Sequence, residues 1–323
     1  MQSYHPMLLD NLNVGLIARL LESDNPAIRY RTMTEILEWP VDDPQVCAAQ
    51  AAIPSFPPVA KLLAAQKPEG YWVQQDYYIP KHYSTFWVLS LLADLGMTAE
   101  NEHVRRGCEY IFAHQRPDGQ FCRRRRIPGH GTIWETQAEP CTQARITRFL
   151  IHFGYRSDPH TRAAIEWLLV TQRQDAMWLC NRPGRGCLRA TLDFLRAAVL
   201  DPLTAAQPAT ARAASAVCDL LLEPGMGRYH VDEAWAVLTY PYFGYGLISA
   251  LGALAQLGYS SDHPKVATAL KYLLNRRLPD GSWPLDECYP HVPLNFGEAG
   301  VSNDWLTLDA LPVLKMGKRD FDL

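Results

Sequence analysis

The sequence predicts an all-α fold built from a repeated pair of helices. A short polar turn that ends on an aromatic residue recurs along the chain, with its Gln or Arg at positions 66, 115, 172 and 277. This period of about fifty residues is typical of arrays of supersecondary units. No run alternates for long between apolar and polar residues, so we expect essentially no β-sheet.

The segment before the first turn, residues 1–56, is predicted to form a helical cap. Asp24 is placed to be the N-cap of a helix and Pro26 lies just inside it, which indicates a helical hairpin. The repeats follow over residues 57–316. Because no Gly/Ser-rich linker interrupts the chain, the sequence predicts a single domain over 1–323.

Each repeat is predicted to contain two helices of different character. The first segment is apolar nearly all round and ends at Gly96, Gly154 or Gly258, which predicts a buried helix with a left-handed C-cap. The second begins near Asp or Asn and has apolar residues at spacings of three and four, which predicts an N-capped helix with one exposed face. Such hairpins bury their apolar faces by stacking around a common axis.

Composition limits the classes of function. With 323 residues, of which 48% are hydrophobic and 20% charged, the chain is long enough to bury a large core. A net charge of −3 gives no general reason to bind nucleic acid. The N-terminus lacks the pattern of a signal peptide, so we expect a cytoplasmic protein. Residues 234–261 carry no charge, but their Pro, Gly and Tyr content favours a buried helix over a transmembrane one. A peripheral membrane contact stays open.

The turns resemble the QW repeat of squalene and oxidosqualene cyclases and the related repeat of protein prenyltransferase β-subunits. The pattern is unbroken in "QKPEGYW" (66–72) and nearly so in "QRPDGQF" (115–121), while "QRQDAMW" (172–178), "RRLPDGSW" (276–283) and "LLEPGMGRY" (221–229) are partial or degenerate copies. The resemblance implies an α/α toroid of about five or six helical hairpins around a central cavity. It also implies an enzyme that acts on an isoprenoid or other hydrophobic substrate.

Two cysteines are the candidate metal ligands. The resemblance places the starts of the inner helices at the mouth of the cavity, and Cys141 and Cys187, about one repeat apart, would lie there on adjacent helices. With His82 they would form a three-ligand zinc site with an open position, similar to the zinc sites of protein prenyltransferases and lanthionine cyclases. The alternative third ligands are His230, His291 and Asp304. The competing interpretation is that both cysteines pack as small apolar residues.

The remaining candidates lie near the same rim. Arg124 and Arg125, within the run 123–126, are candidates to bind a diphosphate or carboxylate, although such a run is also typical of a solvated loop. Aromatic residues are candidates to line the cavity and to stabilise a carbocation, or else to pack between helices; those near the rim include Tyr83, Trp134, Tyr245 and Trp305.

Asp304, His82 and Tyr242 are the candidate catalytic residues. The chain has neither the DxDD motif of squalene-type cyclases nor a DDxxD motif for magnesium diphosphate. Protonation of an alkene would therefore need a lone acid, such as Asp304 or Asp286, with a pKa raised by burial.

Three hypotheses for function follow. The first is a terpene cyclase or prenyltransferase-like enzyme with zinc at the cavity mouth. The second is a terpene cyclase-like enzyme without metal, whose activity would survive chelation. The third is a binding or scaffold module with a protein partner or a second copy of itself, which would expose a large apolar patch.

Overall fold

The computed structural model describes residues 14–127, 131–179, 186–223 and 235–317, without the side chains of 125–127, 132, 134 and 315. The chain divides into two compact units. The central unit comprises residues 57–232 and 291–294, and the terminal unit comprises 1–56, 233–290 and 295–323. The degenerate turn at 221–229 and the alternative ligand His230 lie wholly or partly outside the described residues.

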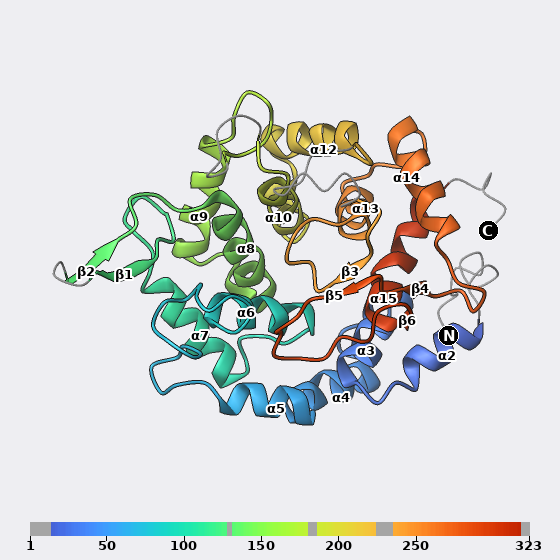
Figure 1. Ribbon diagram of the computed structural model, residues 1–323, viewed down its shortest axis with the longest axis horizontal. Coiled ribbons are helices and arrows are strands. Elements are labelled where there is room, and N and C mark those ends of the chain that lie inside the picture. The colour runs from blue at the N-terminus through green and yellow to red at the C-terminus, as the bar shows by residue number, and fades with distance from the viewer. Residues whose placement is uncertain (1–13, 128–130, 180–185, 224–234, 318–323) are drawn as a thin grey trace. The chain divides into compact units, whose positions relative to one another are not determined.

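The central unit is built around buried helices, each with a more exposed helix beside it. The buried helices are α6 (Thr85–Asp94), α8 (Pro140–Leu150) and α10 (Leu188–Ala198). The outer helices are α5 (Pro57–Ala64), α7 (Glu102–Phe112), α9 (Pro159–Val170), the short α11 (Pro202–Ala205) and α12 (Pro208–Leu220). α8 packs against both α6 and α10, while α7, α9 and α12 lie beside α6, α8 and α10 in turn (Figure 1).

The terminal unit repeats this pattern. Its N-terminal part contains α2 (Val14–Leu21), α3 (Pro26–Arg31), η1 (Thr32–Ile36), α4 (Pro44–Ala52) and η2 (Ile53–Ser55). Its C-terminal part contains α13 (Leu247–Gln256), α14 (Pro264–Asn275), α15 (Asp304–Val313) and η4 (Leu314–Met316). α15 packs against α13, α3 and η1. The N-cap of α3 is Asn25, whose side chain accepts from the Ala27 amide, so the prediction of Asp24 at this position was wrong by one residue.

The sheet content is small, as predicted. β1 (Arg124–Ile127) pairs antiparallel with β2 (Gly131–Trp134), so the arginine run lies on a β-hairpin where a loop was expected. The other strands among the described residues are two residues long: β3 (Thr239–Tyr240) pairs parallel with β5 (Glu287–Cys288), and β4 (Trp283–Pro284) pairs antiparallel with β6 (Ser302–Asn303).

The repeated turns join each outer helix to the buried helix that follows it. In the central unit the Gln side-chain amide donates both to its own turn and to the first turn of the next outer helix: Gln66 to the Gly70 and His103 carbonyls, Gln115 to those of Gly119 and His160, and Gln172 to those of Ala176 and Ala209. The indole of the closing tryptophan donates to a carbonyl of the preceding helix, at 2.8 Å for Trp72 to Leu62 and for Trp178 to Leu168. Each turn therefore ties successive outer helices together.

Glycine is needed in this fold for two reasons, a positive φ angle and a close approach of another backbone. Two glycines separate these reasons, Gly119 in the second repeated turn and Gly154 at the end of a buried helix. Gly119 has φ of +85°, and a Cβ there would lie 2.6 Å from the Ala163 carbonyl oxygen. Gly154 has φ of +99° with nothing within 4 Å of its Cβ position. We expect Gly154→Ala to cost about 1–2 kcal/mol from backbone strain alone, and Gly119→Ala to cost at least about 1 kcal/mol more. Urea unfolding of the two variants measures the difference, and equal losses would show that the close approach to Ala163 is unimportant.

The uncharged stretch 234–261 does not form one long helix. Its helical part is α13, of which seven residues are buried, and β3 precedes it. Among the described residues no single helix is long and apolar enough to cross a membrane, although the bent pair Pro44–Ser55 and Pro57–Ala64 meets the criteria of length and composition together. The three helix-ending glycines, at 96, 154 and 258, all have positive φ, as predicted.

Candidate functional site

Two buried helices of the central unit bring a pair of thiols together at their starts. Cys141 is the second residue of α8, and Cys187 is the N-cap of α10, which packs against α8. The buried Cys141 thiol is hydrogen-bonded to Cys187, and this hydrogen bond, helped by the charge of Arg189, lowers the pKa of Cys141 to about 7 against the opposing effect of burial. The structure thus places the two cysteines side by side, as their spacing predicted.

This pair predicts a pH-dependent signal. We expect Cys187→Ala to raise the pKa of Cys141 toward the ordinary range of thiols, because the largest stabilising contact of the thiolate is lost. The ultraviolet absorbance of the thiolate, followed against pH, measures this shift. Cys141→Ser serves as the blank that identifies the signal. An unchanged titration in Cys187→Ala would contradict the hydrogen bond.

A cation lies beside the thiol pair, and two aromatic rings lie beside that cation. Arg189, the second residue of α10, has its guanidinium carbon 5.5 Å from the centre of the Trp87 ring. The Tyr78 side chain interacts electrostatically with the same guanidinium. Tyr78 and Trp87 are both buried, with ring centres 5.3 Å apart. We call these five residues, Tyr78, Trp87, Cys141, Cys187 and Arg189, the thiol–arginine cluster.

Buried ion pairs support this cluster from the same helices. Arg145 donates three hydrogen bonds of 3.0–3.2 Å to Asp193, and the two side chains are 1% and 2% exposed. Arg148 binds Asp94 at 2.7 Å, and Arg196 lies 3.5 Å from the same carboxylate. Charged groups at such depth are tolerated because they are paired and hydrogen-bonded. They lie on helices that the sequence pattern predicted to be buried.

The described residues do not complete a zinc site at the thiol pair. No group of three or more His, Cys, Asp or Glu side chains within the described ranges is placed to hold a metal ion. The ring of His82, the predicted third ligand, packs edge-on against Trp87 with centres 5.1 Å apart. The cation next to the thiols, Arg189, opposes a divalent ion. We therefore derive no chemical step through zinc.

The arginines of the run 123–126 differ in burial and in hydrogen-bond partners. Arg123 is buried and forms ion pairs with Asp76 at 2.6 Å and Glu135 at 3.5 Å, so it is a structural residue. Arg124 is exposed and donates to the Ala113 carbonyl at 2.7 Å. The side chains of Arg125 and Trp134 lie outside the described part of the structure. Tyr83, half-buried, precedes α6 by two residues.

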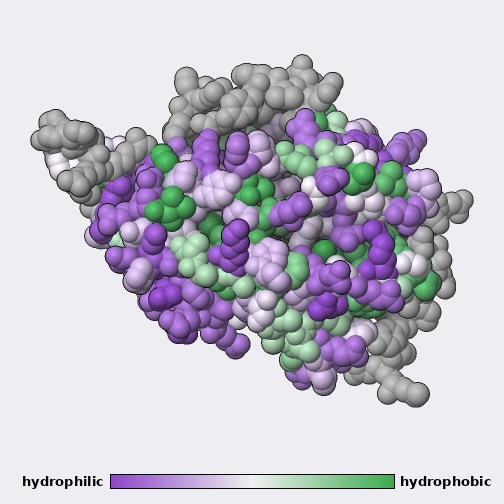
Figure 2. Space-filling model, turned by 60° about the horizontal axis from the view of Figure 1, so that its bottom comes forward, coloured by the Kyte–Doolittle hydropathy of each residue, from purple (hydrophilic) through white to green (hydrophobic). Residues whose placement is uncertain are grey.

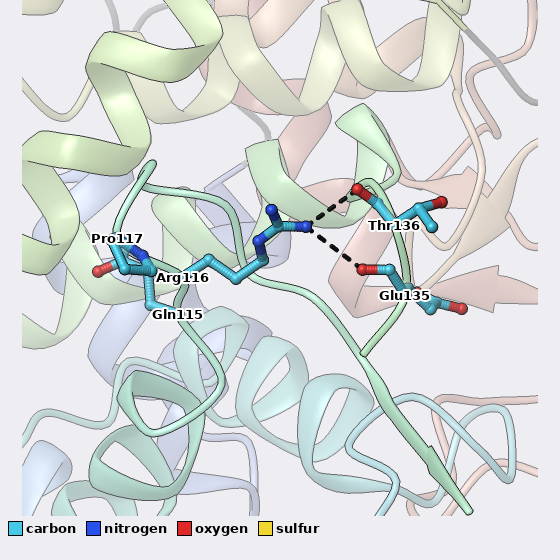
Figure 3. Close-up of a pocket in the computed structure, with 5 residues that line it drawn as sticks. All are labelled: Gln115, Arg116, Pro117, Glu135 and Thr136. Atoms are coloured by element: carbon cyan, nitrogen blue, oxygen red, sulfur yellow. Dashed lines mark hydrogen bonds between the residues drawn. The ribbon is translucent and has the colours of Figure 1, made fainter. Parts of the chain in front are cut away.

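A surface pocket of about 440 Å³ lies beside the second repeated turn (Figure 3). Its lining comprises Gln115, Arg116, Pro117, Glu135 and Thr136. The Arg116 guanidinium points across it and donates to the carbonyl oxygens of Thr136 at 3.0 Å and Glu135 at 3.5 Å. The lining contains neither an aromatic ring nor a thiol, so we place the candidate chemistry elsewhere.

The terminal unit contains a buried group of aromatic rings around the start of α15. Tyr240 stacks on Trp305 with ring centres 5.4 Å apart and an interplanar angle of 13°. Tyr242 and Phe296 meet Tyr240 edge-on at 5.4 and 5.2 Å. We call these four residues the aromatic group. Tyr245, predicted to belong with them, is half-buried and packs instead against Trp235 at 5.0 Å.

Asp304, the first residue of α15, is the acid next to the aromatic group in sequence. Burial raises the pKa of its carboxyl group, and the charge of Arg19, whose Nη1 lies 2.8 Å from Oδ1, opposes this rise. The side chain is 26% exposed. The direction of this pKa shift is the one that a lone proton donor needs, and the catalytic role of Asp304 stays a prediction.

Solved structures with a similar fold correspond to nearly the whole chain. A variant of the type II terpene cyclase MstE from Scytonema, in complex with geranylgeranyl dihydroxybenzoate, is 16% identical with a TM-score of 0.50, over 97% of this chain and 98% of that one. The chain has the α/α toroid fold of type II terpene cyclases. A protein from Actinoplanes has the same toroid with 17% identity and a TM-score of 0.50, over 94% of this chain and 99% of that one. No protein-family model and no curated protein sequence matches the chain.

Sequence reasoning identified the two cysteines but did not identify Arg189 as the positively charged residue beside them. Arg189 was visible only as one basic residue at the start of a predicted inner helix. The signal was the presence of Arg and Asp on helices whose other residues are apolar, in particular Arg189 and Asp193 four residues apart. Charges at buried helical positions indicate either paired networks or binding groups.

Proposed function

We propose that this protein is a terpene cyclase-like enzyme that acts on an isoprenoid substrate and starts the reaction by protonating an alkene. The main support is the full-length likeness of the toroid to a terpene cyclase in complex with a geranylgeranyl substrate. The second support lies in the chain itself, where partial burial raises the pKa of the Asp304 carboxyl group. A carboxyl group must hold its proton at working pH to act as a general acid, and burial favours the protonated form.

In this proposal Asp304 donates its proton to a terminal alkene carbon, and the substrate becomes a carbocation. The cation cyclises as successive double bonds attack it, and loss of a proton from carbon ends the reaction, so the product is an isomer of the substrate. Tyr240, Tyr242 and Trp305 are proposed to stabilise the cation through the negative faces of their rings. The roles predicted for His82, Tyr83, Trp134 and Tyr245 in catalysis or binding stay predictions.

The test is conversion of geranylgeranyl substrates by the purified full chain. We expect geranylgeranyl dihydroxybenzoate or geranylgeranyl diphosphate to yield a cyclic product of unchanged mass, detected by mass spectrometry after separation. Activity should survive chelation, because no step needs a metal. A heat-inactivated sample is the control. Failure to convert any isoprenoid substrate would contradict the proposal.

Zinc at Cys141 and Cys187 stays a prediction with its own measurement. Elemental analysis of the untagged protein, beside a Cys141→Ser/Cys187→Ser variant, decides it. About one zinc per chain that disappears in the variant would favour thiol or prenyl-transfer chemistry at the thiol–arginine cluster. No zinc in either protein would leave the two thiols as a hydrogen-bonded pair.

The scaffold alternative has no comparable support. On the face shown in Figure 2, hydrophobic residues stand in separate groups among hydrophilic ones. Large exposed hydrophobic side chains such as Val14, Val73 and Val170 are scattered along the sequence. Scattered residues of this kind are normal for protein surfaces and mark no binding site by themselves.

A further inference from the structure

Two thiols of the central unit are in contact between neighbouring helices. The Cys141 thiol at the start of α8 is hydrogen-bonded to Cys187, the N-cap of α10, and the two helices pack against each other. The sulfurs of a disulfide are about 2.0 Å apart, so two thiols in hydrogen-bond contact need only a short further approach to be joined. The fold therefore holds these two thiols where a disulfide can form.

The two cysteines differ in their access to solvent. Cys141 is 7% exposed, whereas Cys187 is half-buried and can be reached from outside. Cysteines that respond to oxidants are typically accessible and lie next to a second thiol that completes the reaction. In this pair Cys187 is the accessible thiol, and Cys141 is the second one.

The other described cysteines have different surroundings. Burial raises the pKa of Cys108 and Cys122, and it raises that of Cys218 to about 12, which is typical of unreactive structural thiols. Cys47 and Cys288 are exposed, and each donates to a backbone carbonyl at 3.3 Å. We expect these five to stay separate thiols, so they serve as internal references for the pair.

We propose that Cys141 and Cys187 form a reversible disulfide, which is a redox switch between the starts of α8 and α10. The oxidant is a small disulfide such as glutathione disulfide, and a small thiol reverses the reaction. Both cysteines belong to the central unit. The inference goes beyond the proposed function, because it does not depend on any isoprenoid chemistry.

The reaction consists of two thiol–disulfide exchanges. In the first, Cys187 gives its proton to water and attacks one sulfur of glutathione disulfide, so that a mixed disulfide forms and one glutathione thiolate leaves. In the second, the Cys141 thiolate attacks the Cys187 sulfur, the protein disulfide forms, and the second glutathione thiolate leaves. The two cysteines lose two electrons and two protons, and glutathione disulfide becomes two glutathione molecules. The charge of Arg189 favours the Cys141 thiolate.

The test is equilibration of the full chain in buffers that contain reduced and oxidised glutathione at several ratios. After acid quenching, the remaining thiols are blocked, and mass spectrometry of the unreduced digest measures the fraction of peptide linked through Cys141 and Cys187. We expect this fraction to rise with glutathione disulfide and to disappear with dithiothreitol. Cys47 and Cys288 should take up glutathione instead of forming a link.

The same buffers with the chain unfolded in urea measure the contribution of the fold. We expect the ratio of linked to unlinked Cys141 to be at least about 10-fold higher in the folded chain, because the fold holds the two thiols at a high effective concentration. The oxidised protein should also unfold at a higher urea concentration than the reduced one, because the link restricts the unfolded chain.

The single variants distinguish the two thiols. Cys141→Ser lacks the second thiol, so glutathione should stay attached to Cys187. Cys187→Ser lacks the accessible thiol, so Cys141 should stay unmodified. Cys47→Ser removes an exposed thiol outside the pair and, as the matched control, should form the link like the unaltered protein. Circular dichroism of the reduced variants shows that they are folded.

Three results would overturn the inference. These are no linked peptide at any glutathione ratio, a link no more frequent in the folded than in the unfolded chain, and oxidation that joins Cys141 or Cys187 to a different cysteine. Failure of the proposed function is a separate result, because conversion of isoprenoid substrates enters none of these measurements.

Discussion

Asp304→Asn is expected to lower kcat for cyclisation by about 10²- to 10⁴-fold, the usual contribution of a general acid. The amide keeps the shape of the side chain but cannot donate a proton of comparable acidity. Binding of a saturated analogue should change little, since the loss lies in the chemical step. Product formation under single-turnover conditions measures the effect.

The control for Asp304 is its neighbour Asp280, whose side chain is 52% exposed and whose charge acts on Asp304. Asp280→Asn changes the same charge network without removing the proposed donor, so activity should stay within a few-fold. Arg19→Met should act on the pH profile, because removal of this cation raises the pKa of Asp304 further. The protonated acid then persists to higher pH, and the alkaline fall in rate moves upward. Equal activities of Asp304→Asn and Asp280→Asn would exclude Asp304 as the donor.

Asp193→Asn is expected to reduce the free energy of unfolding by about 3–5 kcal/mol, because it leaves Arg145 as a buried charge without its partner. Arg145 and Asp193 are among the least exposed charged side chains of the central unit, at 1% and 2%. Arg189 and Arg196, each 3.9 Å from the same carboxylate, add to the unbalanced positive charge. Chemical denaturation followed by circular dichroism measures the loss.

Two further variants show whether burial causes this loss. Glu102→Gln removes one partner of an ion pair with Arg106 in which the Glu102 side chain is 68% exposed, so we expect a change below about 0.5 kcal/mol. Asp193→Leu combined with Arg145→Met should be more stable than Asp193→Asn alone, because it removes both charges. An effect of Asp193→Asn no larger than that of Glu102→Gln would contradict a buried, uncompensated charge.

The fold was predictable because its signals are local and repeated. The glycines that end the buried helices, such as Gly96 and Gly154, need positive φ, and the turns at Gln66 and Gln115 recur with similar hydrogen bonds. Such features depend on a few adjacent residues. The N-cap of α3 shows where such prediction ends, because it is Asn25 and not Asp24. Asp and Asn have similar preferences for the N-cap, so the sequence does not tell at which of the two residues the helix begins.

The candidate site was predictable only in part. The spacing of Cys141 and Cys187 located the thiol pair, because residues one repeat apart fall at the same level of neighbouring helices. The position of Arg189 beside the thiols was not predictable, because it depends on how the helices pack in three dimensions. The raised pKa of Asp304 likewise depends on its burial and on Arg19, which is 285 positions earlier in the chain but 2.8 Å away.

The most direct test of the central claim is to run the reaction in D₂O and measure the mass of the product. Because Asp304 exchanges its proton with solvent, protonation of an alkene by this acid places solvent deuterium on carbon. We predict a cyclic product with the composition of the geranylgeranyl substrate, except that one carbon-bound hydrogen is replaced by deuterium. A product without deuterium, or one that has lost the diphosphate of geranylgeranyl diphosphate, would show that the reaction does not begin by protonation and would contradict the account.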